Sequence, residues 1–250
     1  MTFATRCAIL LMKIMSKLLR HFEPVAVFLR EKRLSQIKPV RGRSFFNLND
    51  VFRFADKVFP VVHEKLFERY QEIWSSGNIH PIKGDTSYAY IDEDEEEGMA
   101  IGKYGTVYDA LSALGHETGH HVFGLKTTLP SEIMPIATEE LIKRNIRDAR
   151  VRITTTADDW LIGHMPKDCM FTDKGLYYFG SLAAIPLVDL ITEGKLDYMD
   201  LLCFKKGYGR QGILSERDNN RLASQLCDLG ATPEFTLKSM QKFIASHELK

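Results

Sequence analysis

The sequence predicts an α+β fold that is mostly helical and contains one small antiparallel sheet. Apolar residues recur in most segments at the three- to four-residue spacing of helices that bury one face. Two strand-like segments, 86–91 and 98–104, flank the acidic run Asp92–Glu97, and this pattern indicates a hairpin. At 250 residues, the chain is long enough to bury one sizeable core.

The first 45 residues are expected to form a helical segment that packs on a domain comprising residues 46–250. Apolar residues follow helical spacing from about residue 5 to residue 33, with a break near Pro24. The stretch before Glu23 carries cations and no acid, so import into an organelle or binding at a membrane surface is the alternative. Lys13 interrupts the apolar run and no small-residue cleavage site follows it, which favours packing.

Prolines and capping residues indicate where the next helices begin and end. A helix is expected from Asn47 or Asn49 to Phe59, where Pro60 should stop it. A second apolar-periodic segment follows at residues 61–74 and precedes the hairpin.

Beyond the hairpin, the sequence predicts a largely helical remainder. One helix should run from about residue 106 to residue 123, where Gly124 ends it, and a loop to Pro135 should follow. The next helix is expected at about residues 136–153. Thr232 and Pro233 form an N-cap and first-turn pair that opens the last helix.

Composition excludes several classes of protein. The 33 basic residues balance the 33 acidic ones, whereas a dedicated nucleic-acid binder is usually markedly basic. Four scattered cysteines without CxxC spacing are typical of reduced core residues rather than of a disulfide framework or a cysteine zinc site. No apolar run is long enough for a transmembrane helix. These absences favour the cytoplasm as the location.

The segment HETGH, residues 116–120, contains the residues that indicate a metal-binding and catalytic site. His116, Glu117 and His120 fall on one arc of the expected helix, with His121 at the edge of that arc, and apolar residues occupy the opposite side. Two histidines four residues apart can share one metal ion. Glu117 lies between them in sequence and can take a proton from a metal-bound water, while His121 is expected to have a structural role.

This HExxH motif resembles that of the zincin zinc metallopeptidases. The resemblance implies a zincin-like catalytic core, a Zn²⁺ cofactor held by His116 and His120, and Glu117 as the general base of peptide hydrolysis. It also implies that the hairpin before the motif helix supplies the edge strand along which zincins hold a peptide. The metzincin branch is excluded, because it would require Gly at position 123 and His at position 126, where Phe123 and Lys126 stand.

An acid on the helix expected at residues 136–153 is the best remaining candidate for the third zinc ligand. Asp148 is preferred, because it lies in the middle of that helix, where the helix dipole does not account for an acid. Glu140 and Glu139 are the alternatives in the expected first turn, and His164 is a weaker one. An acid as the third ligand would place the chain near the gluzincin or aspzincin branches.

Catalysis of acyl transfer also needs a donor for the developing oxyanion. Tyr177, Tyr178 and His164 are the candidates downstream of the ligand helix. The leading hypothesis is therefore a zinc-dependent peptidase that acts on a protein or peptide, with no nucleic-acid partner. A zinc hydrolase of another amide and an inactive regulatory or structural protein with the same fold remain the alternatives. The sequence leaves the substrate and the oligomeric state open.

Overall fold

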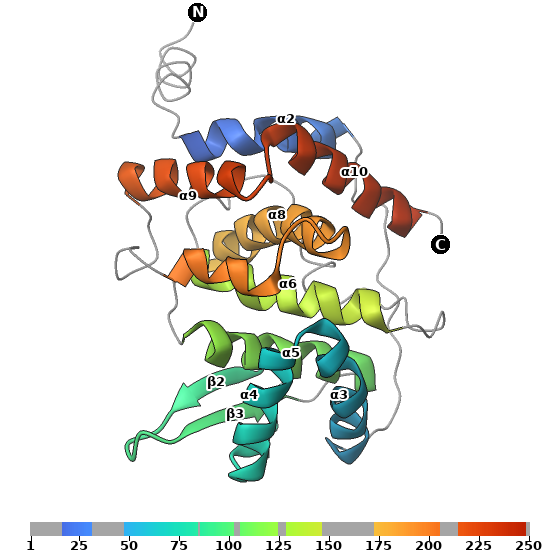
Figure 1. The fold of residues 1–250 in the computed structure, drawn as a ribbon, viewed down its shortest axis with the longest axis vertical. Helices are drawn as coiled ribbons and strands as arrows, with labels where there is room; N and C mark the ends of the chain where they lie inside the picture. Colours follow the sequence, from blue (N-terminus) through green and yellow to red (C-terminus); the bar gives the residue numbers. More distant parts are fainter. Residues whose placement is uncertain are drawn as a thin grey trace, which may run out of the picture.

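The computed structural model describes residues 17–31, 48–84, 86–102, 106–124, 129–146, 173–205 and 215–248. These segments stack in three layers, which Figure 1 shows from the outer helices at the top to the sheet at the bottom. The described part of the chain is mostly helical and contains one small sheet, so the predicted α+β class is confirmed.

The outer layer brings together the two ends of the described chain. Helix α2 (Lys17–Glu31) packs against α9 (Glu216–Asp228) and α10 (Pro233–Glu248), as Figure 1 shows. Pro24 lies inside α2, so the break expected there is wrong. The predicted start of the last helix is confirmed, because Pro233 is its first residue and the Thr232 hydroxyl accepts a hydrogen bond from a backbone N–H one turn on.

The middle layer consists of α6 (Leu129–Asn145) and α8 (Asp173–Thr192), followed by the short 3₁₀ helix η3 (Tyr198–Lys205). Helix α6 lies between α5 and α8, and its residues 132–142 are all buried. The loop expected up to Pro135 is therefore wrong, because α6 begins at Leu129 and passes through Pro135.

The bottom layer contains the sheet, α5 (Val107–Phe123) and two further helices. Strands β2 (Tyr88–Ile91) and β3 (Glu97–Ile101) are antiparallel, which confirms the predicted hairpin. Strand β1 (Ile79–Pro81) pairs with β3 in parallel, so the sheet is mixed rather than antiparallel. The sequence did not indicate β1, because three residues that end in a proline are too few for an alternating pattern.

Helices α3 (Leu48–Val62) and α4 (Glu64–Ser75) complete this layer. Pro60 lies inside α3, so the predicted stop at that residue is wrong. The chain instead breaks at His63, whose side chain accepts a hydrogen bond from the backbone N–H of Lys65 and caps α4. The proposed cap residue Asn47 lies outside the described residues.

Among the described helices, none is both long and apolar enough to cross a bilayer.

Candidate metal centre

Local capping places the motif helix α5 where the sequence predicts it. The hydroxyl of Thr106 accepts a hydrogen bond from the backbone N–H of Asp109 and caps the start of the helix. Gly124 ends it with φ at 101°, a left-handed value that favours glycine, and donates its N–H to the carbonyl of His120. Asp109 also accepts a hydrogen bond from the Thr106 hydroxyl, so its side chain takes part in capping the helix start.

Two glycines of the motif helix allow α6 to approach it closely. A Cβ on Gly119 would lie 3.0 Å from the Cα of Pro135 and 3.1 Å from the Thr138 hydroxyl. A Cβ on Gly115 would collide with the end of the Ile142 side chain. Small residues at these two positions therefore bring the acids of α6 within reach of the motif histidines.

His116 and His120 of α5 meet Glu132 of α6 in a buried cluster. Oε2 of Glu132 lies 3.5 Å from Nε2 of His116, and Oε1 lies 3.7 Å from Nε2 of His120. The two imidazole rings are nearly perpendicular, with centroids 5.0 Å apart. Within the described ranges, this is the one group of three histidines, cysteines or acids whose ligand atoms could hold a metal ion.

The geometry of this cluster fits a zinc ion. Two donors bound to tetrahedral zinc at about 2.0–2.2 Å lie about 3.4 Å from each other. The separations of 3.5 Å and 3.7 Å, each to one oxygen of Glu132, are close to that value, and one ligand atom from each of the three residues lies within 4.8 Å of the other two. Oε2 of Glu132 is buried and makes no hydrogen bond of good geometry with a described residue, so a cation would satisfy it.

Charge in the cluster also suits a cation. Burial, together with the neighbouring His116, lowers the pKa of His120 to about 4, so this imidazole is neutral at pH 7 and can coordinate. Burial alone would lower the pKa of His116, but Glu132 and Glu139 raise it well above its ordinary value. Burial alone would raise the pKa of Glu132, but the two histidines hold it below its ordinary value.

Glu117 lies beside the cluster on the same helix and is buried. Burial is the main reason that its pKa rises to about 7, and the backbone N–H of Ala89 on β2 donates a hydrogen bond to its carboxylate. A carboxylate with such a pKa can both take and return a proton near neutrality. The arrangement therefore places a competent proton acceptor next to the three ligand atoms.

The hydrogen bond from Ala89 shows which edge of the sheet faces the cluster. Ala89 lies opposite Met99, and the backbone N–H of Met99 donates to Asn78, on the side of β1. In an antiparallel ladder, opposite residues either exchange both hydrogen bonds or direct both away from each other. The backbone groups of Ala89 therefore point to the outer edge of β2, which no described strand pairs with and which we call the free edge, and this edge lies toward Glu117.

None of the other predicted ligands is a member of the three-residue cluster among the described residues. Glu140 pairs with Arg144 at 3.0 Å and with Lys143 at 3.8 Å, and it is not a member of the three-residue cluster. Glu139 lies 3.5 Å from Nδ1 of His116, on the opposite side of the ring from Glu132. Asp148 and His164 lie outside the described residues.

Glu132 is the member of the three-residue cluster that was not predicted from the sequence. It was assigned to a loop, whereas it lies in the first turn of α6, two residues after Pro130. Pro130 at the start of a helix, followed by an acid in the first turn, is a recognised helix-start pattern and was the available signal.

His121, Tyr177 and Tyr178 are three further residues that the sequence singled out. His121 is buried, with its Nε2 at 2.9 Å from the carbonyl oxygen of Gly98 and its Nδ1 at 3.2 Å from Glu97, which fits the structural role expected of it. Tyr177 and Tyr178 lie in the first turns of α8. Gly180, less than one turn further on, packs against Glu132.

No protein-family model, curated protein or solved structure matches the chain. The comparisons therefore identify no family, and the resemblance to zincins stays with the motif residues His116, Glu117 and His120.

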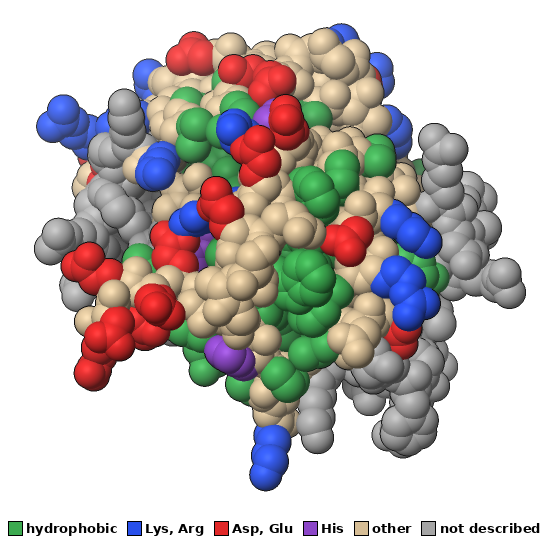
Figure 2. All heavy atoms as spheres, turned by 60° about the horizontal axis from the view of Figure 1, so that its bottom comes forward, with side chains coloured by type: hydrophobic (Ala, Val, Ile, Leu, Met, Phe, Trp, Pro, Cys, Tyr) green, Lys and Arg blue, Asp and Glu red, His purple; other side chains and the backbone are tan. Residues whose placement is uncertain are grey.

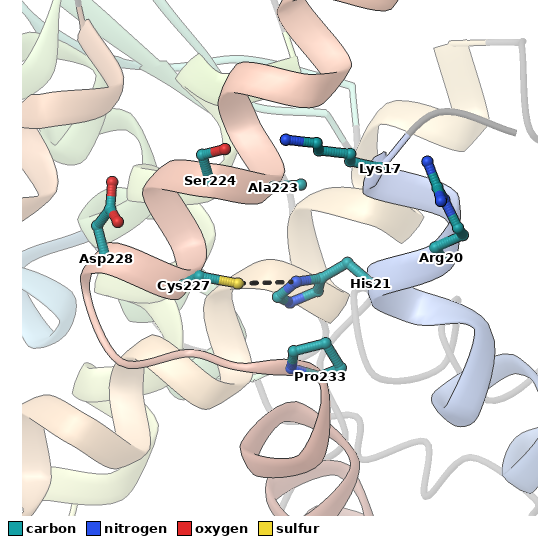
Figure 3. Close-up of a pocket in the computed structure, with 8 residues that line it drawn as sticks. All are labelled: Lys17, Arg20, His21, Ala223, Ser224, Cys227, Asp228 and Pro233. Carbon is teal, nitrogen blue, oxygen red and sulfur yellow. Dashed lines mark hydrogen bonds between the residues drawn. The ribbon is translucent and has the colours of Figure 1, made fainter.

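A hollow lies between α2 and α9, far from the motif helix in the fold (Figures 1 and 3). It has a volume of about 410 Å³, and in it the Sγ atom of Cys227 lies 3.7 Å from Nδ1 of His21. Burial raises the pKa of the Cys227 thiol, and the nearby acids Asp228 and Glu234 raise it further. The thiol therefore stays protonated and is not an activated nucleophile, although Lys17 lines the same hollow.

Proposed function

We propose that the chain is a zinc-dependent peptidase in which His116, His120 and Glu132 hold the metal and Glu117 is the general base. The observation that carries the proposal is the convergence of these three ligand atoms from two helices, with separations that suit zinc. Glu132 takes the place that the sequence assigned to Asp148. A purely structural zinc site would not need Glu117 beside it.

The free edge of β2 supports a peptide as the substrate. Extended peptides bind many proteins by adding a strand to an exposed sheet edge, where backbone hydrogen bonds supply the affinity. Ala89 directs its backbone groups to this edge, next to Glu117. Ile91 lies two residues further along β2 and is 52% exposed, so it offers an apolar contact for a substrate side chain.

In the proposed peptide hydrolysis, each residue of the site has a separate role. A bound zinc ion would supply Lewis-acid activation of water and of the scissile carbonyl. Glu117 accepts the proton of the attacking water and returns it to the leaving amine, for which its position beside the cluster is suited. Tyr177 and Tyr178 remain the candidates for an oxyanion donor, since their helix packs against Glu132 through Gly180.

The test combines metal analysis with a peptide-library digest. Purified protein is expected to contain about one zinc per chain, and it should cleave a fluorogenic peptide library until a chelator removes the metal. Glu117→Gln should keep the zinc and lower kcat by at least about 100-fold, because general-base catalysis contributes about 10²–10⁴-fold.

Asp109→Asn serves as the matched control on the same helix, since Asp109 exchanges hydrogen bonds with Thr106 at the helix start. Undiminished cleavage by Glu117→Gln would rule out its role as the base. Zinc binding without cleavage of any peptide would favour the hydrolase of another amide or the inactive scaffold.

A further inference from the structure

We infer that Glu139 is a positioning residue of the metal centre, which holds His116 through Nδ1 so that Nε2 faces the cation. The inference rests on the proposed metal site and concerns metal affinity rather than the choice of substrate. Glu139 was considered as a ligand from the sequence, and its place in the fold gives it a different role.

The imidazole of His116 lies between two carboxylates of the same helix. Glu132 is 3.5 Å from Nε2, and Glu139, about two turns further along α6, is 3.5 Å from Nδ1. An imidazole can coordinate a metal through one nitrogen while the other donates its proton. Because Nε2 belongs to the three-ligand cluster, Nδ1 is the nitrogen that donates, and Glu139 is its acceptor.

Glu139 is itself held in place by its surroundings. It is only 9% exposed, and its Oε1 lies 3.3 Å from Nζ of Lys143 on the next turn of α6. The close packing of α5 on α6 at Gly115 and Gly119 sets the distance between this carboxylate and the ring. A carboxylate that accepts the N–H of the ring nitrogen not bound to the metal fixes the tautomer of the histidine and raises the basicity of the coordinating nitrogen.

The neighbouring acid provides an internal contrast. Glu140 is as buried as Glu139 and carries the same charge, but it faces Arg144 rather than a motif histidine. A general effect of negative charge on α6 would involve both acids, whereas orientation of His116 involves Glu139 alone.

The experiment measures zinc affinity of the full chain by competition with a chromophoric chelator. The variants are Glu139→Gln, Glu139→Leu and the control Glu140→Gln, each checked for folding without metal by circular dichroism and thermal unfolding. Removing an acceptor of this kind weakens metal binding by about 10- to 100-fold. We expect about 10-fold for Glu139→Gln, whose amide oxygen still accepts, about 100-fold for Glu139→Leu, and no change for Glu140→Gln.

A second readout follows the proton on Nδ1 of His116 by NMR in the zinc-loaded protein. The wild-type chain should show a slowly exchanging, low-field Nδ1 proton that is lost in Glu139→Leu, and a merely structural role would not produce that signal. The inference is overturned if Glu139→Leu binds zinc as tightly as the wild type, or if Glu140→Gln weakens binding equally. It is also overturned if Glu139→Gln abolishes binding as a lost ligand would.

Failure of the proposed function would look different. If the protein bound zinc and cleaved no peptide, while its zinc affinity still fell from the wild type to Glu139→Gln and then to Glu139→Leu, the peptidase proposal would fail and the role of Glu139 would stand.

Discussion

Glu132 is a carboxylate that the fold buries against two imidazoles, an arrangement that is costly without a counter-charge. In the absence of metal, a proton on His116 supplies that charge, since its pKa is raised by Glu132 and Glu139. Zinc would replace the proton with two positive charges and would satisfy the oxygen that lacks a good hydrogen bond.

Glu132→Gln should therefore remove zinc binding while leaving the fold intact, because the amide keeps the shape and loses the charge. Zinc at about 100 times its dissociation constant stabilises a protein by about 2.7 kcal/mol, which raises the melting temperature of a chain of this size by about 5–10 °C. Differential scanning fluorimetry with and without zinc measures the shift. We expect the shift in the wild type and in Glu140→Gln, and its loss in Glu132→Gln; an undiminished shift in Glu132→Gln would contradict its role as a ligand.

The motif residues of the candidate cluster could be predicted from the sequence, whereas its third member, Glu132, could not. His116, Glu117 and His120 share one helix, and helical geometry relates them directly. Glu132 belongs to the following helix, so its place depends on how α5 and α6 cross, which local periodicity does not specify. Asp148 lies outside the described part of the chain, so its assignment as a ligand stays a prediction.

At the scale of elements, the crossing of α5 and α6 determines whether a metal centre can form. Gly119→Ala would place a methyl group 3.0 Å from the Pro135 backbone, which cannot move without shifting α6. Overpacking of this kind costs about 1–3 kcal/mol. We expect a lower urea midpoint and weaker zinc binding, because Glu132 would move away from the histidines.

Gly84→Ala is the matched control for this change. The nearest atom to a Cβ at Gly84 is the backbone nitrogen of Thr86, at 3.9 Å, so the added methyl group has space. Equal stability and zinc affinity for Gly119→Ala and the wild type would show that the close approach is not required.

The free edge of β2 gives a second prediction at this scale. Ala89→Pro removes the backbone N–H that donates to the Glu117 carboxylate, and the sheet loses no ladder hydrogen bond because this N–H points away from β3. That hydrogen bond lowers the pKa of Glu117, so its loss should raise the pKa and move the acidic limb of the kcat–pH profile to higher pH. Steady-state kinetics over a range of pH should show that shift with unchanged zinc content, and Ala89→Gly should behave as the wild type; an unshifted profile would show that this N–H does not act on Glu117.

Helix boundaries show where sequence rules succeed and where packing overrides them. The ends of α5 were predicted because Thr106 and Gly124 act through local capping hydrogen bonds. The prolines at positions 24, 60 and 135 were expected at breaks, and each lies inside a helix. At Pro135 the reason is visible, since α6 is enclosed by α5 and α8 and its proline packs against Gly119.

At the scale of the whole molecule, the outer layer makes stability depend on pH. Burial lowers the pKa of His21 to about 4, although Glu234 acts to raise it. In the unfolded chain the pKa of histidine is about 6.5. As the pH falls from about 6.5 to about 4, the unfolded chain takes up a proton that the folded protein does not, so stability is lost across that window.

We expect this loss to be about 3 kcal/mol, and His21→Gln should remove it, because glutamine does not titrate. Urea denaturation of the metal-free protein between pH 7.5 and pH 4 measures the difference between the two proteins. His80→Gln, at an exposed position of β1, is the control and should leave the wild-type slope unchanged. An identical slope for His21→Gln and the wild type would show that His21 does not contribute.

The pairing of α2 with α9 and α10 has a consequence for synthesis of the chain. Roughly 200 residues separate Glu31 from Pro233, and translation at about 5–20 residues per second takes about 10–40 s to cross that interval. During that time Phe22, Val25 and Leu29, which the finished fold buries, lack the packing that α9 and α10 supply. We expect a ribosome-associated chaperone to bind the nascent chain in this state. Release before α10 emerges would leave the apolar face of α2 exposed and able to associate with other chains.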